Sequence, residues 1–157
     1  MMKYILPIIL LLNTFLFGVE LKIKADSFNA DQNKGLSIFK GNVHIAKSKD
    51  ELNASKVTIY TDKKNQPVKF VATGNVSFKI QTDKKAKYIG SANRVIYIPL
   101  KKEYYFYENV VLKQINEKKE IEGDEVILNT SSGRAYAKGL SKKPVIMTFD
   151  IPEAQKE

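Results

Sequence analysis

The stretch "FKGNVHI" at residues 39–45 returns twice along the chain, as "ATGNVSF" at residues 72–78 and, less closely, as "YENVVLK" at residues 107–113. Its asparagine recurs at intervals of 33 and then 34 residues, at Asn42, Asn75 and Asn109. A period of this length is typical of one supersecondary unit used several times. The chain is therefore expected to repeat one short structural unit.

A second phrase, made of a small residue, two polar residues and a valine, alternates with the copies of the first. This phrase stands at the start of three segments, which are "ASKVTIY" at residues 54–60, "ANRVIYI" at residues 92–98 and "GDEVILN" at residues 123–129. In both phrases apolar and polar side chains alternate, as they do in a strand with one buried face. Since no stretch of a dozen residues after the N-terminal segment has helical apolar spacing, the sequence predicts an all-β, antiparallel fold.

The alternation assigns one apolar face to each strand, because successive side chains of a strand point to opposite faces. In the first copy His44 falls on the polar face. The apolar set read in this way is Phe39, Val43, Ile45, Val57, Ile59, Phe70, Val76, Val95, Phe106, Val110, Leu112, Val126 and Leu128. These side chains are enough to line the space between two facing sheets.

The residue before each asparagine, which is Gly41, Gly74 or Glu108, falls on the same apolar face. Glycine inside a strand marks a bulge, a bend or a close backbone approach, so a strongly curved sheet is expected. The glycines serve either this curvature alone or the opening of a groove between facing sheets. Glu108 would place a carboxylate on the inner face, and Pro99 should end its strand early or place it at an edge.

Residues 1–18 have the pattern of a signal peptide. One positive charge, Lys3, precedes an apolar run over residues 4–17, and Gly18 is a small residue at a possible cleavage site. The alternative is an uncut N-terminal anchor. We expect one domain over residues 19–150 and a disordered tail over residues 151–157; the last strand should carry Val145, Met147 and Phe149 on one face.

Composition excludes several kinds of site. The chain has no cysteine, so disulfides, thiolate nucleophiles and Cys-ligated metals are excluded. It has one histidine and none of the common catalytic or phosphate-loop motifs. Paired carboxylates such as Asp50 and Glu51 are interpreted as solvated turn residues. No enzyme, cofactor or metal is therefore expected.

The formal charge is +9, which raises the question of a nucleic-acid partner. Export argues against nucleic acid, and the lysines are scattered rather than gathered in one stripe with stacking aromatic residues. They are either an ordinary solvated surface or an attraction for an anionic lipid or saccharide. Charge alone does not decide between these two.

The succession of motifs resembles a known family. "LKIKADSFNADQNKGLSIFKGNVHI", "LNASKVTIY", "GSANRV" with "YYFYENVVL", and "IEGDEVILNTSSGRAYAKGLSKKPV" are similar, in this order, to the LptA/OstA-like family of periplasmic lipopolysaccharide-transport proteins. The resemblance covers nearly all of the chain after residue 18. It implies a slightly open antiparallel β-jellyroll of two facing, twisted sheets that binds the acyl chains of lipid A in an apolar groove.

The resemblance also implies site residues and partners. Ile23, Phe78 and Tyr97 match inward groove positions and join the apolar set above, while Leu21 and Ile23 match the family's first strand. Head-to-tail copies would bridge the two membranes through the periplasm, with an LptC-like inner-membrane protein at the N-terminal edge. An LptD-like outer-membrane protein would bind the C-terminal edge, at Val145, Met147 and Phe149. The alternative within the same system is a membrane-anchored, LptC-like protein.

Overall fold

The computed structural model describes residues 19–140 and 142–153, and this part of the chain is almost entirely β. All strand pairings within it are antiparallel. The elements are β1 Leu21–Lys24, β2 Ser27–Asp31, β3 Leu36–Lys47, β4 Asp50–Thr61, β5 Pro67–Gln81, β6 Lys87–Ile98, the 3-10 turn η1 Pro99–Lys101, β7 Glu103–Gln114, β8 Lys119–Asn129, β9 Ala135–Lys138 and β10 Ile146–Phe149. The predicted all-β class is confirmed.

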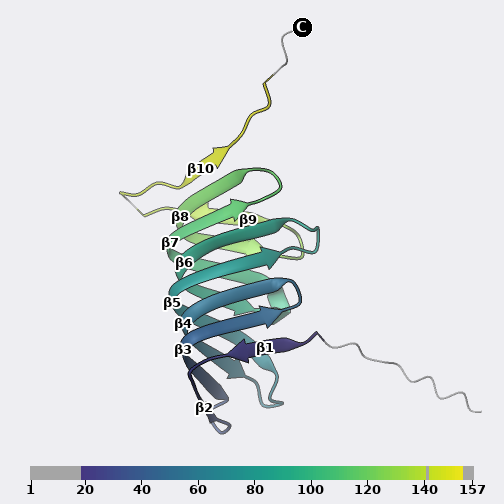
Figure 1. The fold of residues 1–157 in the computed structure, drawn as a ribbon, viewed down its shortest axis with the longest axis vertical. Helices are drawn as coiled ribbons and strands as arrows, with labels where there is room; N and C mark the ends of the chain where they lie inside the picture. The colour runs from purple at the N-terminus through teal and green to yellow at the C-terminus, as the bar shows by residue number, and fades with distance from the viewer. Residues whose placement is uncertain (1–18, 141, 154–157) are drawn as a thin grey trace, which may run out of the picture.

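The pairing register folds one continuous sheet into two facing layers. β1 pairs with residues 44–47 of β3, whereas β2 pairs with residues 36–40 of the same strand. In the same way β10 pairs with residues 119–122 of β8, and β9 with residues 125–128. Each long strand therefore contributes one half to a first layer, edged by β1 and β10, and its other half to a second layer, edged by β2 and β9 (Figure 1).

Side chains of the two layers meet in the space between them. Phe78 in the first-layer half of β5 stacks on Phe106 in the second-layer half of β7, with 4.4 Å between ring centroids. Both side chains belong to a single hydrophobic core. The predicted slightly open β-jellyroll is confirmed, and its two sheets are halves of the same strands.

The repeated Gly-Asn phrase forms the corner at which a strand passes between layers. Gly41 and Asn42 have φ angles of 80° and 46°, and the next copy, Gly74 and Asn75, has 85° and 45°. At each of these corners the ladder register shifts, as at a β-bulge. Two successive left-handed residues bend the strand, and glycine and asparagine are the residues that tolerate this conformation best.

The third corner corrects the predicted position of Glu108. Glu108 has a φ of 65° and Asn109 a φ of 52°, so this third copy of the phrase forms the same corner as the first two, although it lacks the glycine. The Glu108 side chain is exposed and does not face the core. The alternation rule gave the wrong face for Glu108 because a residue at a corner belongs to neither face of the sheet. The register around it is kept, since Val110 is 1% exposed.

The small-polar-polar-valine phrase forms the corner in β4 and β6, the strands that alternate with those carrying the Gly-Asn phrase. Ala54 and Val57 are three residues apart, yet both are buried in the core. Ala92 and Val95 repeat this relation in β6. In β4 and β6 the inward positions are thus even-numbered before the corner and odd-numbered after it, so a single alternation does not describe either strand from end to end.

The ends of the strands agree with the sequence in part. β6 ends at Ile98 and Pro99 begins η1, so the predicted interruption is confirmed. Val145 precedes β10. The predicted signal peptide lies outside the described residues, as do residues 154–157 of the predicted tail; residues 151–153 form no regular element. Within the described chain no helix is long and apolar enough to span a membrane.

We expect Gly74→Ala to lower the free energy of unfolding by about 1–3 kcal/mol. A Cβ at this position would lie 2.6 Å from Ser55 Oγ, and the φ of 85° disfavours any side chain. Glu108→Gly, at the equivalent corner, should instead leave stability unchanged or raise it by about 0.5–1 kcal/mol. Urea unfolding measures both. A neutral Gly74→Ala would show that the corner does not require glycine.

Candidate functional site

All sixteen residues predicted to line a groove lie between the layers. Each is either a member of the hydrophobic core or packs against it. Four of them, Ile45, Phe70, Phe78 and Tyr97, line a pocket that reaches the surface. The other twelve are core residues or their immediate neighbours: Ile23, Phe39, Val43, Val57, Ile59, Val76, Val95, Phe106, Val110, Leu112, Val126 and Leu128. Their assignment to a lipid groove stays a prediction.

The pocket lies between the two layers, toward the end of the stack that carries β1. The wall from the first layer consists of Ile45, Leu52, Phe78 and Ile80. The wall from the second layer consists of Phe70, Tyr97 and Tyr104. Leu21 of the edge strand β1 also contributes to the lining. The walls are apolar, so they attract hydrocarbon without imposing an orientation on it.

The pocket is small because the layers touch. Its volume is about 50 Å³, which corresponds to one or two water molecules at about 30 Å³ each. The aromatic side chains Phe78 and Phe106 stack directly behind it. A long acyl chain can therefore enter only if the two layers separate or these side chains move.

Two side-chain hydrogen bonds join the layers at the mouth of this pocket. The Tyr104 hydroxyl donates to Asp50 Oδ2 at 3.0 Å, and Lys47 Nζ donates to the Tyr97 hydroxyl at 3.0 Å. Tyr97 and Tyr104 stack with 4.4 Å between centroids, and Lys47 lies 4.8 Å from the Tyr97 ring centroid. We call this group of four residues the mouth cluster.

The position of Asp50 corrects the sequence interpretation, which placed it in solvent. Its side chain is half-buried, and Oδ1 also accepts a hydrogen bond from the Gln81 backbone N–H at 2.9 Å. Burial raises the pKa of Asp50, and these hydrogen bonds and the charge of Lys47 oppose that rise. Burial and the nearby Asp50 raise the pKa of Tyr104 well above its usual range, so its hydroxyl remains a donor.

Farther along the same rim, the layers are joined by backbone contacts. The Asp83 N–H donates to the Thr130 carbonyl at 2.8 Å, and the Thr130 N–H donates to the Lys102 carbonyl at 2.8 Å. These residues lie in the turns that follow β5, β8 and η1. Access to the interior is therefore easier at the N-terminal half of the stack than here.

The strands at the two ends of the stack have unpaired edges. In Figure 1, β1 and β2 lie at one end of the long axis and β10 at the other. Among the described residues, β1 pairs only with β3, and β10 only with β8. The predicted edge residues are accessible: Leu21 and Val145 are each 37% exposed, Met147 52% and Phe149 51%, and Ile23 is half-buried.

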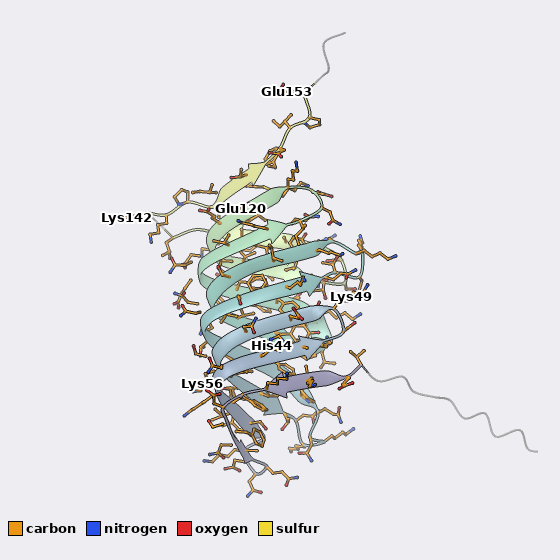
Figure 2. All side chains as sticks on the ribbon, in the orientation of Figure 1. His44, Lys49, Lys56, Glu120, Lys142 and Glu153 are labelled. Atoms are coloured by element: carbon orange, nitrogen blue, oxygen red, sulfur yellow. The ribbon has the colours of Figure 1, made fainter. Side chains whose placement is uncertain are left out.

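Sequence reasoning missed Lys47, Asp50 and Tyr104. A polar residue beside a hairpin turn has no sequence signal that separates it from solvated surface, because its partner lies 54 residues away in the chain. Leu52 and Ile80 were also left out of the predicted site, although alternation puts Ile80 on the same face as Phe78. His44 lies on the outer face, where its Nδ1 is 2.7 Å from Asn53 Oδ1 (Figure 2).

The described part of the chain holds no candidate metal site. No group of three or more histidine or acidic side chains there is arranged to hold a metal ion. The apolar interior and the mouth cluster are therefore the candidate binding features.

Comparison with known proteins identifies the family. A family profile described as "LptA/(LptD N-terminal domain) LPS transport protein" matches residues 22–134. The chain belongs to this family. Its predicted membership is confirmed, and its function is lipopolysaccharide transport. A search among curated proteins finds no match.

A solved structure shows the same fold. LptH, described as the LptA homologous periplasmic component of the conserved lipopolysaccharide transport device from Pseudomonas aeruginosa, matches with a TM-score of 0.74. The sequences are 17% identical, and the match covers 84% of this chain and 96% of LptH. At this identity the likeness supports the fold, and the family assignment rests on the profile.

We expect acidification to stabilise the wild type relative to Asp50→Asn. Burial raises the folded-state pKa of Asp50 above its unfolded value, so the native state binds this proton more tightly. The resulting stabilisation is present below the unfolded pKa of about 3.9 and is lost as pH rises through the folded value. Urea unfolding of both proteins between about pH 4 and 7 measures the difference in the free energy of unfolding.

The exposed neighbour provides the control for this measurement. Glu51→Gln removes a carboxyl group from the same turn, and its side chain is exposed. The difference in the free energy of unfolding between this variant and the wild type should change little with pH. If the difference between wild type and Asp50→Asn is also independent of pH, the carboxyl group is not held in a desolvated site.

Proposed function

We propose that this protein is a periplasmic bridge that carries lipopolysaccharide from the inner to the outer membrane with the acyl chains held between its two layers. The observation that carries the proposal is the apolar pocket between the layers of a lipopolysaccharide-transport fold. It acts by binding alone, without turnover.

Hydrocarbon burial supplies enough free energy for such binding. Each methylene removed from water contributes roughly 0.8 kcal/mol. Opening the mouth breaks the Asp50–Tyr104 and Lys47–Tyr97 hydrogen bonds, and each such bond has a net contribution of about 0.5–1.5 kcal/mol, or about 1.5–3 kcal/mol where one partner is charged. A few buried methylenes therefore offset the loss of both bonds. The inner walls remain apolar when the layers part, so several acyl chains can replace contacts between core side chains.

The unpaired strand edges support assembly into a bridge. An exposed strand edge can add a strand from another molecule, and a head-to-tail contact that does not close can propagate. β1 and β10 lie at opposite ends of the stack and carry exposed apolar side chains. We assign an LptC-like inner-membrane partner to the β1 end, an LptD-like outer-membrane partner to the β10 end, and self-association to both.

We expect Phe78→Glu to abolish lipopolysaccharide binding. Phe78 lines the pocket and is 5% exposed, so a carboxylate there would oppose entry of hydrocarbon. Ser77→Glu is the matched control, because Ser77 is the adjacent residue of β5 and its side chain is exposed. Far-UV circular dichroism verifies the fold, and lipid mass spectrometry of the purified proteins measures retained lipopolysaccharide.

A second approach does not depend on the stability of a buried charge. A photo-reactive residue is placed at Ile45, in the pocket, or at His44, on the outer face of the same strand. Lipopolysaccharide should crosslink at position 45 and not at position 44. Equal crosslinking at both positions would contradict the interior binding site.

Deletion of residues 19–25, which removes β1, should abolish co-purification with the inner-membrane partner. β1 is the first-layer edge at that end and has one unpaired side. Deletion of residues 151–157 is the control, since this segment lies beyond β10. Circular dichroism verifies that both variants fold. Unchanged co-purification after deletion of residues 19–25 would refute the assignment of this edge.

A further inference from the structure

A second hollow adjoins the mouth of the apolar pocket. Its volume is about 600 Å³, and it lies between the turn after β3, the turn after β5 and the start of η1. It shares Lys47, Asp50 and Tyr97 with the apolar pocket. We call it the rim basin; its charged lining consists of Lys47, Lys49, Lys85, Lys102, Asp50 and Asp83.

The carboxylates of the rim basin already have partners. Both oxygens of Asp50 accept hydrogen bonds, from Tyr104 and from the Gln81 backbone. Asp83 lies 3.3 Å from Lys102 Nζ in an exposed ion pair. The basin therefore carries more cationic groups than its carboxylates neutralise.

Three lysines of the rim basin are available to an anion. Lys47, Lys49 and Lys85 form no ion pair with another group in the part of the chain that the structure describes. Lys49 and Lys85 are exposed and lie in or next to turns, and Lys49 is seen at the rim in Figure 2. Lys47 is half-buried at the junction of the basin with the apolar pocket.

The geometry of Lys47 suits a ligand with both an apolar and an anionic part. Its ammonium group donates one hydrogen bond to the Tyr97 hydroxyl, which leaves two of its three N–H donors unused by that bond. The contact with the Tyr97 ring holds the side chain in place, which reduces the entropy lost when it binds. Hydrocarbon in the pocket would place an attached polar group beside this ammonium.

We propose that the rim basin is a binding site for phosphate groups of the lipid, with Lys47, Lys49 and Lys85 as its cationic ligands. The inference rests on the proposed function, because the lipid is the molecule whose acyl chains occupy the adjoining pocket. A phosphate monoester carries about −1.5 to −2 charges at pH 7 and three strong acceptor oxygens, which several ammonium groups can share.

Phosphate binding would also favour opening of the mouth. A phosphate oxygen competes with the Tyr97 hydroxyl for Lys47, and it attracts the ammonium group more strongly because both partners of the new bond are charged. Transfer of Lys47 from Tyr97 to phosphate removes one of the two hydrogen bonds that join the layers in the mouth cluster. Headgroup capture and acyl-chain entry are thus coupled through one side chain.

The test compares lipopolysaccharide with the same molecule after removal of its lipid phosphates. The wild type should bind the phosphorylated form about tenfold more tightly at low salt, since each exposed lysine–phosphate pair contributes about two- to fivefold. A variant with Lys47, Lys49 and Lys85 each replaced by Gln should lose this preference. The preference is the ratio of the two affinities within each protein, so an effect of the Lys47 replacement on opening of the mouth applies to both lipid forms alike.

The control variant removes the same net charge elsewhere. Lys40, Lys56 and Lys138 are exposed, and none lines the basin. Lys40 and Lys56 pair across β3 and β4 beside a corner, and Figure 2 shows Lys56 on the side opposite Lys49. Replacement of all three by Gln should keep the phosphate preference. An equal loss in this variant would overturn the proposal in favour of a general attraction between net charges.

The remaining outcomes separate the two proposals. If the wild type binds both lipid forms equally well, the rim basin is not a phosphate site and the acyl-chain site stands. If the wild type binds neither form, the proposed function fails and this inference fails with it. Titration with inorganic phosphate alone should show only weak binding; saturation at the affinity of the phosphorylated lipid would overturn a lipid-headgroup site in favour of a free-phosphate site.

Discussion

The fold depends on one backbone constraint, which is a pair of left-handed residues in the middle of each strand that carries the Gly-Asn phrase. At Gly41–Asn42, Gly74–Asn75 and Glu108–Asn109 the φ angles are all positive. These corners bend the sheet so that one strand contributes to both layers. Without them the alternating apolar faces would form one flat sheet with an exposed hydrophobic side, which would invite aggregation rather than enclose an interior.

In the proposed function, the apolar contact between the two layers both stabilises the fold and provides the surface for lipid. Phe106 and Val126 have no exposed surface, whereas Phe70 and Tyr97, in the same layer, are half-buried and line the pocket. Burial of methylene groups has no directional requirement, so a lipid chain can replace a side chain as a neighbour at similar free energy. A protein of this kind needs a core that is adequate for folding yet can be parted locally.

The sequence predicted those parts of the molecule that depend on local pattern. Alternation and the repeat predicted the strand class and placed thirteen inward residues in or against the core, since a one-residue error moves a side chain to the opposite face. The other three, Ile23, Phe78 and Tyr97, came from the family resemblance. Glu108 was misplaced because corner conformation has no separate signal once glycine is lost. The Asp50–Tyr104 contact joins residues whose proximity follows only from the folding of the layers.

The layers are joined at two places along one rim by different kinds of bond, and this difference gives the molecule a direction. Near Thr130 the turns are joined by backbone groups, whose unpaired state would be costly if buried, and any sequence would supply them. At the mouth cluster the layers are joined by side chains of Lys47, Asp50, Tyr97 and Tyr104. Side-chain bonds can be exchanged for bonds to a ligand by a rotamer change alone, whereas backbone bonds require the turns to move. Opening should therefore begin at the N-terminal half of the stack, which is the end assigned to the inner-membrane partner.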